Sequence, residues 1–200
     1  HDIDLVRFFT FNNLLLKVKQ SLGLTRSFNS SGGLMRQFFE ILLNISRLKR
    51  KEDPYWNFDL LCSIEKELDF TSSFFFLHKD LRHNDSYYSF SDPDIRSLIK
   101  QFQEEGFEIG LHGSVRTTSD YHKLIWQKNK LEQVAESSGQ GIRQHRVLYD
   151  YTVTTKVQQE AGFLYDSTLG FAQHEGFRNG YCYPFKLYDF ENDRPFRVWK

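Results

Sequence analysis

The chain has 200 residues, of which 40% are hydrophobic, and its 26 basic side chains balance its 26 acidic ones. A chain of this size and composition can bury one substantial core without disulfides or a metal ion merely to fold, so we expect a single domain over residues 1–200. The formal net charge of +0 supplies no field that would attract nucleic acid or an anionic membrane, and we expect neither as a partner.

The cysteine pattern and the hydropathy bear on the compartment. Cys62 and Cys182 fit neither a paired metal-binding spacing nor a disulfide framework, which favours a reducing environment. No apolar stretch reaches the ~20 residues of a membrane span, and nothing resembles a secretory signal. We therefore expect a cytoplasmic location. The chain begins inside what reads as a motif and ends without a stop signal, so we also expect a segment of a longer protein, and the oligomeric state stays open.

Segments with helical and strand periodicity alternate along the chain. Apolar residues at helical spacing predict amphipathic helices near 34–48 and 60–68, and the continuous apolar run at 72–77 is typical of a buried parallel strand. Helices are also predicted from Asp92-Pro93 to Gly106, from about 119 to 138, and over 154–161, with strands at 107–111 and 142–148 between them.

The repeated order of strand, loop and helix predicts an α/β fold with a parallel sheet, either a closed barrel or an open doubly wound sheet. The position of the polar residues favours the barrel, because barrel enzymes carry their chemistry at the C-terminal ends of the strands. The residues predicted at those ends are Asp2, Asp4, His78, His112, His145 and Asp166. Carboxylates and histidines in such places are typical of metal-dependent hydrolases. No glycine-rich phosphate loop follows a strand, which disfavours nucleotide binding.

Four of these stretches have a familiar order and spacing. They are Asp2-Ile3-Asp4, Ser73–Leu77, His112-Gly113-Ser114 and Arg143-Gln144-His145. In that order they resemble the motifs of the polysaccharide deacetylases of carbohydrate esterase family 4, the NodB-homology domain. The match is to a bacterial subgroup that reads HD-x-D at the start, and the stretches at 162–168 and 176–180 are similar to it as well.

The resemblance implies a distorted (β/α) barrel of the NodB type, here incomplete at both ends, and a divalent cation, zinc first, with cobalt or nickel as alternatives. It implies hydrolysis of an N-acetyl or other N-acyl group on a sugar or polysaccharide. Asp2 matches the catalytic base, and Arg143 matches the arginine that holds this base ionised. Asp4 and His112 match metal ligands.

The chain departs from the family pattern at the second metal histidine. Four positions after His112 it has Arg116, which leaves the expected ligand set incomplete. His145 stands where the arginine motif has proline, and at the end of a neighbouring strand it could be the third ligand. His1 and His78 compete with it for that role.

Further residues are candidates for binding a carbohydrate substrate, or else for holding loops. They are His78, Asp166 and Arg178. The family's general acid matches no residue here, and His174 is a weak substitute. The alternative function is a catalytically inactive deacetylase-like domain that binds glycan or positions a partner enzyme. Arg116 keeps that alternative open, because an arginine close to a cation is disfavoured by charge repulsion unless it points away.

Overall fold

The computed structural model describes residues 1–26, 31–45, 53–79, 85–135 and 139–200. The chain divides into two compact units, His1–Asp4 with Phe70–Lys200, and Leu5–Asp69. The single domain predicted over residues 1–200 stays a prediction. Within the described ranges, no helix combines the length and the apolar character needed to cross a membrane.

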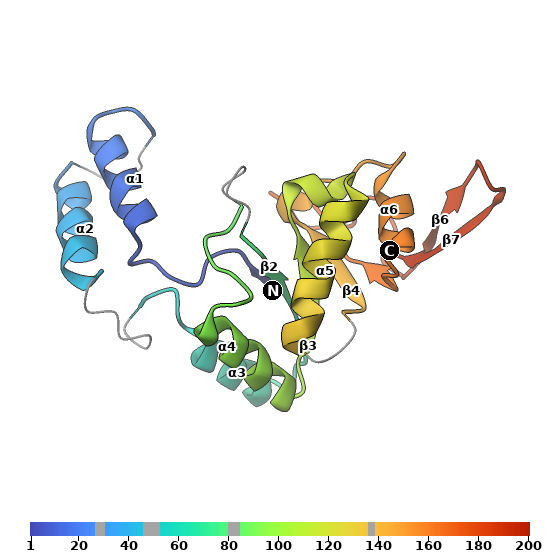
Figure 1. The fold of residues 1–200 in the computed structure, drawn as a ribbon, viewed down its shortest axis with the longest axis horizontal. Coiled ribbons are helices and arrows are strands. Elements are labelled where there is room, and N and C mark those ends of the chain that lie inside the picture. Colours follow the sequence, from blue (N-terminus) through green and yellow to red (C-terminus); the bar gives the residue numbers. More distant parts are fainter. Residues whose placement is uncertain (27–30, 46–52, 80–84, 136–138) are drawn as a thin grey trace. The chain divides into compact units, whose positions relative to one another are not determined.

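The larger unit is built on a seven-stranded sheet with the order β1-β2-β3-β4-β5-β7-β6 (Figure 1). Its strands are β1 (Asp2–Ile3), β2 (Ser73–Leu77), β3 (Glu108–Gly113), β4 (Gly141–Gln144), β5 (Tyr165–Asp166), β6 (Lys186–Asp189) and β7 (Arg194–Trp199). All neighbouring pairs are parallel except β6 with β7, which is antiparallel. The predicted α/β class and parallel sheet are therefore confirmed.

The sheet of the described residues is open, because β1 and β6 are its two edges. The antiparallel pair β6–β7 extends the sheet beyond β5, so the barrel that the sequence favoured is not closed. The C-terminal ends of the parallel strands still share one edge of the sheet, which is where open α/β folds also place ligands.

Most of the helices of the larger unit form where the sequence predicted them. The larger unit contains α4 (Pro93–Glu104), α5 (Tyr121–Ala135), α6 (Thr154–Glu160) and the short 3₁₀ helices η2 (Val115–Thr118) and η3 (His145–Val147). Helix α4 begins after Asp92, whose carboxylate accepts a hydrogen bond from the Asp94 amide, as expected of an N-cap followed by proline. The predicted helix near 119–138 ends at Ala135 as far as it is described, since residues 136–138 lie outside the described ranges.

The core of the larger unit is aromatic. Phe74 and Phe76 on β2 are fully buried, and the Phe74 ring lies 4.2 Å from that of Phe102 on α4. Two strand glycines leave room for rings of adjacent strands: a Cβ at Gly110 would lie 2.5 Å from the Phe75 ring, and one at Gly141 would meet the Tyr165 ring. Burial of these rings supplies the hydrophobic free energy that keeps the strands in register.

The smaller unit contains α1 (Phe11–Ser21), α2 (Ser31–Asn44) and α3 (Phe58–Glu67). The buried carboxylate of Asp53 accepts hydrogen bonds from the amides of Phe8, Phe9 and Tyr55 at 2.8–3.0 Å. Helices α2 and α3 confirm two sequence predictions, although residues 46–48 of the first lie outside the described ranges. Helix α1 was not predicted, although its apolar residues Phe11, Leu14, Leu15 and Val18 recur at helical spacing, and none of its residues is buried.

Candidate metal centre

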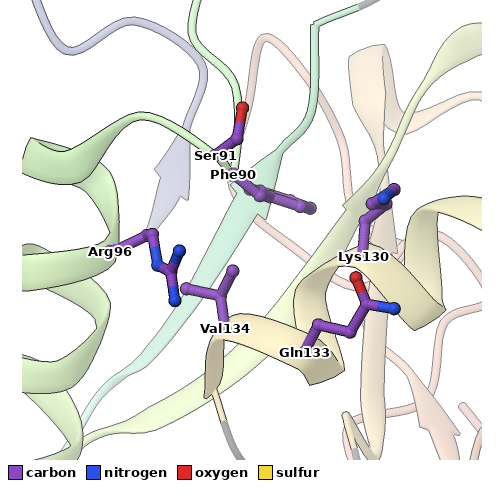
Figure 2. Close-up of a pocket in the computed structure, with 6 residues that line it drawn as sticks. All are labelled: Phe90, Ser91, Arg96, Lys130, Gln133 and Val134. Atoms are coloured by element: carbon purple, nitrogen blue, oxygen red, sulfur yellow. The ribbon is translucent and has the colours of Figure 1, made fainter.

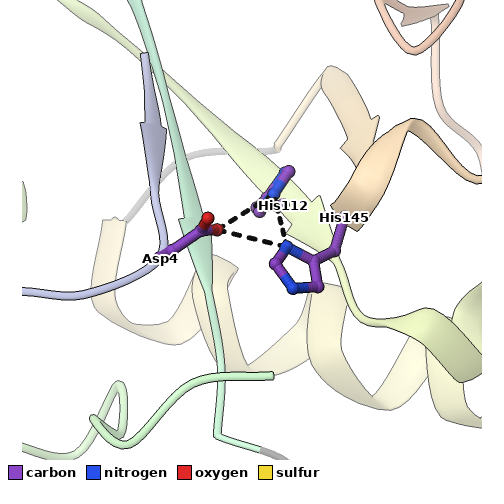
Figure 3. Close-up of side chains that lie close together, drawn as sticks. All are labelled: Asp4, His112 and His145. Carbon is purple, nitrogen blue, oxygen red and sulfur yellow. Dashed lines mark hydrogen bonds and ion pairs between the residues drawn. The ribbon is translucent and has the colours of Figure 1, made fainter. Parts of the chain in front are cut away.

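Three strand ends of the larger unit bring two histidines and a carboxylate together. Asp4 directly follows β1, His112 lies near the end of β3, and His145 directly follows β4. Their ligand atoms all lie within 4.8 Å of one another (Figure 3). Because β1 to β4 are parallel neighbours, residues far apart in the sequence meet at one edge of the sheet.

The contacts within this triad are short and mutual. Asp4 Oδ1 lies 3.2 Å from His112 Nε2 and 3.2 Å from His145 Nδ1, and the two ring nitrogens are 3.2 Å apart. Burial raises the pKa of the Asp4 carboxyl, but the adjacent His112 and His145 rings lower it by more, so the pKa lies well below its ordinary value. The Asp4 side chain is therefore a carboxylate at neutral pH.

The hydrogen bond at His112 Nδ1 determines which ring nitrogen of His112 carries the proton. His112 Nδ1 lies 2.8 Å from the carbonyl oxygen of Arg143, and a carbonyl oxygen can only accept a hydrogen bond. In the neutral ring of a metal ligand the proton would then be on Nδ1, and the lone pair of the Nε2 atom that faces Asp4 and His145 would be available to a cation. Histidine ligands of metals are commonly oriented by a backbone carbonyl in this way.

Two further observations indicate that the triad could hold a divalent cation. Asp4 Oδ1 is buried, and it has no well-formed hydrogen bond among the described residues. Ligand atoms about 2.0–2.1 Å from a zinc ion at tetrahedral angles lie roughly 3.3 Å from one another, close to the spacing here. One carboxylate and two imidazoles are also a common ligand set of zinc sites with an open position for water.

The backbone turns sharply after His145. The strand predicted over 142–148 ends at Gln144, and Arg146 and Val147 have φ values of 59° and 54°. The left-handed region is strained for a β-branched residue such as Val147. The Val147 carbonyl accepts a hydrogen bond of 3.1 Å from Arg178. The chain thus leaves β4 at His145, and Arg178 holds the turn that follows.

Asp2 and Arg143 form an ion pair beside the triad. Arg143 Nε donates to Asp2 Oδ2 at 3.0 Å, and Arg143 Nη1 donates to the Ser167 carbonyl at 2.9 Å. Both side chains are about one-third exposed, at 35% for Asp2 and 31% for Arg143. Arg143 thus orients His112 through its main chain and holds Asp2 through its side chain.

The remaining predicted site residues are not part of this cluster. Asp166 is buried, and its carboxylate is held by Lys200 Nζ at 2.8 Å and by the Thr168 amide at 2.9 Å. His78 is buried too, and its Nδ1 accepts a hydrogen bond from the Phe90 amide. Arg178 contacts the turn after His145. The substrate contacts expected of these three residues stay a prediction.

His1, His174 and Arg116 make contacts with residues outside the triad. The His1 ring packs on Phe74 at 4.8 Å, and the His174 ring packs on Phe171 at 5.0 Å. Arg116 forms an ion pair of 3.2 Å with Asp120. The positive charge that occupies the position of the family's second histidine is therefore balanced by a carboxylate one turn further along the chain.

Two buried residues near the triad, Asp85 and Tyr88, were not among the site residues predicted from the sequence. Asp85 Oδ2 accepts a hydrogen bond of 2.9 Å from the Val115 amide, and its Oδ1 lies 4.0 Å from Arg146 Nη2. It therefore lies between the chain that follows His112 and the chain that follows His145. Tyr88 lies between the ends of β1 and β2, with hydrogen bonds to both strands.

A surface hollow of about 210 Å³ lies elsewhere on the larger unit, between α4 and α5 (Figure 2). It is lined by Phe90, Ser91, Arg96, Lys130, Gln133 and Val134. It contains no residue of the triad and no carboxylate or imidazole, so the triad remains the better candidate for chemistry.

Comparison with known proteins gives a likeness in structure and none in sequence family. No family model matches the chain, and no curated protein matches it. The chain is similar in structure to a crystal structure described as that of a "putative polysaccharide deacetylase from Mycobacterium smegmatis", with a TM-score of 0.49 and 20% sequence identity. The likeness covers 99% of this chain and 55% of that one, so this chain spans about half the length of that protein.

Proposed function

We propose that the protein is a metal-dependent hydrolase that removes an N-acetyl or other N-acyl group from a sugar or polysaccharide. The observation that carries the proposal is the convergence of Asp4, His112 and His145, with the Asp2–Arg143 ion pair beside them. The motif resemblance supplies the reaction class. Asp4, His112 and His145 would hold the cation, with zinc as the first choice.

A divalent cation at this position would polarise the amide carbonyl of the substrate and acidify a water molecule. Asp2 acts as the base, because its carboxylate is held in place beside the triad by the hydrogen bond from Arg143 Nε. Hydrolysis forms a C–O bond from water to the acyl carbon and breaks the C–N bond. Asp2 takes one proton of the water, and that proton passes on to the leaving nitrogen, so that Asp2 returns to its starting form and the products are an acetate or other carboxylate and an amino sugar.

Arg116 no longer argues for the inactive alternative. Its ion pair with Asp120 gives the guanidinium a partner of opposite charge, which weakens the repulsion that an unpaired arginine would exert on a cation. His145 supplies the imidazole that the missing second histidine would have supplied. The catalytic proposal therefore accounts for both departures from the family pattern.

The first test is zinc titration of chelator-treated protein at neutral pH, with a chromophoric competitor to measure affinity. We expect about one equivalent of tightly bound zinc. Asp4→Ala, His112→Ala and His145→Ala should each weaken binding by more than the roughly 10–100-fold that loss of an outer-shell partner costs. Asp2→Asn should keep the metal and lower kcat roughly 10²–10⁴-fold on N-acetylated amino-sugar oligomers, assayed by acetate release.

His122→Ala is the matched control, because His122 is an exposed histidine on α5 and its removal should change neither affinity nor turnover. Loss of zinc in Asp2→Asn alone would reverse the roles of the two carboxylates. A folded protein that binds no zinc would refute the hydrolase and favour the glycan-binding alternative.

A further inference from the structure

The parallel ladder between β1 and β2 is interrupted immediately before Asp4. Asp2 pairs with Phe75 and Ile3 with Phe76, and the Phe75 amide donates to the His1 carbonyl at 2.8 Å. In a regular parallel ladder the next bond of this series would run from the Leu77 amide to the Ile3 carbonyl. It would bring Asp4 opposite Leu77.

The hydroxyl of Tyr88 takes the place of that bond. The Leu77 amide donates to the Tyr88 hydroxyl at 2.8 Å, and the hydroxyl donates to the Ile3 carbonyl. The phenol oxygen therefore satisfies both backbone groups while keeping the two strands apart. Because buried backbone groups must find partners, an inserted hydroxyl allows the ladder to end here without leaving either group unpaired.

Tyr88 is held firmly in this position. Its side chain is buried, its carbonyl accepts a hydrogen bond of 2.9 Å from the Lys79 amide, and Phe90 two residues later is bound to His78 Nδ1. Burial raises the pKa of the hydroxyl, and the nearby Asp4 charge raises it further, although the bond from the Leu77 amide opposes both effects. The hydroxyl therefore stays protonated and can donate to Ile3.

The end of the ladder matters because Asp4 and His112 belong to strands that are not neighbours. Leu77 of β2 is in register with His112 of β3, so a residue paired with Leu77 from β1 would stand two strand spacings, about 10 Å, from His112. That spacing separates the Cα atoms, and a continued ladder would also place the Leu77 side chain on the same face between Asp4 and His112. Because the ladder ends after Ile3, the Asp4 side chain can approach His112 without Leu77 between them, and its Oδ1 lies 3.2 Å from His112 Nε2.

We propose that Tyr88 is a positioning residue for the metal centre, because its hydroxyl ends the β1–β2 ladder after Ile3 and frees Asp4 to reach His112 and His145. The inference rests on the proposed function in so far as a cation occupies the triad. The hydrogen bonds of the Tyr88 hydroxyl are to the main chain of Leu77 and Ile3 and not to ligand atoms of the triad. Tyr88 therefore acts on Asp4 through the main chain of Ile3.

The test is Tyr88→Phe, which removes only the hydroxyl. We expect zinc affinity to fall roughly 10–100-fold, the range for partners that orient a ligand. The absorption spectrum of the cobalt-loaded variant should also change, because the Asp4 carboxylate is displaced. Tyr149→Phe is the matched control: it removes a hydroxyl whose hydrogen bond is to Thr155 on α6 and not to β1, β2 or the triad, and should leave affinity and spectrum unchanged.

A measurement on the unaltered protein makes the test independent of how well the variant folds. By NMR, the Tyr88 hydroxyl proton should exchange slowly with water and show a nuclear Overhauser effect to the Leu77 amide. If no such proton is found, or if Tyr88→Phe keeps both the zinc affinity and the cobalt spectrum of the parent, the positioning role is wrong while the hydrolase proposal stands. If the parent binds no zinc, both proposals fall.

Discussion

Arg143 joins the two halves of the candidate site through different atoms. Its carbonyl oxygen sets the tautomer of His112, and its guanidinium holds Asp2 and the Ser167 carbonyl. A change of side chain leaves the carbonyl in place. The metal-binding half and the base should therefore respond separately to substitution at this one position.

We expect Arg143→Met to bind zinc within about twofold of the parent and to lower kcat roughly 10²-fold, because Asp2 loses its partner and its orientation. Arg143→Lys should recover only part of the rate, since an ammonium group cannot reproduce the two-pronged contact to Asp2 and Ser167. Zinc titration and acetate release check this. A large loss of zinc in Arg143→Met would mean that the side chain, and not only the carbonyl, supports His112.

At the scale of elements, a buried ion pair ties the end of β7 to β5. Lys200 Nζ lies 2.8 Å from Asp166 Oδ2 and 2.8 Å from Gln158 Oε1 on α6, and both charged side chains have no exposed surface. Burial lowers the pKa of Lys200, while the Asp166 charge opposes that shift without cancelling it. A charge buried in this way is costly without its partner.

Lys200→Met should therefore destabilise the protein by about 3–5 kcal/mol, because it leaves the Asp166 carboxylate buried and unpaired. The double variant Lys200→Met with Asp166→Asn should recover most of that loss, since no unpaired charge remains. Urea unfolding measures both. Equal instability of the single and double variants would indicate that packing of the lysine stem, and not its charge, supports this junction. Zinc affinity should be unchanged in the double variant.

At the scale of the whole molecule, the candidate metal centre connects strands that are far apart in the chain. Asp4 comes from the first strand of the sheet, whereas His112 and His145 come from its third and fourth strands. A cation that binds all three can bind only when these strands are assembled. Metal binding should therefore stabilise the native state of the larger unit.

At a free zinc concentration 100 times the Kd, the free energy of unfolding should rise by about 2.7 kcal/mol. For a protein of this size that corresponds to an increase in Tm of about 5–10 °C. Calorimetry with and without zinc checks the shift. The shift should vanish in Asp4→Ala and persist in His122→Ala, and an equal shift in all three proteins would point to zinc binding elsewhere on the surface.

The sequence by itself determined the features that depend on local patterns. The apolar run of β2 predicted a strand buried on both faces, and Asp92-Pro93 predicted the start of α4, because capping and burial are encoded in neighbouring residues. The same local patterns predicted that Asp4 and His112 follow or end strands. These predictions needed no knowledge of which strand lies beside which.

Only the tertiary structure decided which of the candidate residues meet. It brought His145 to Asp4 and His112, and it placed His1 and His78 in other contacts. It gave Asp166 a buried lysine partner and inserted Tyr88 between two strands. Such contacts depend on the order and register of strands distant in the chain, and no periodicity in the sequence specifies that order.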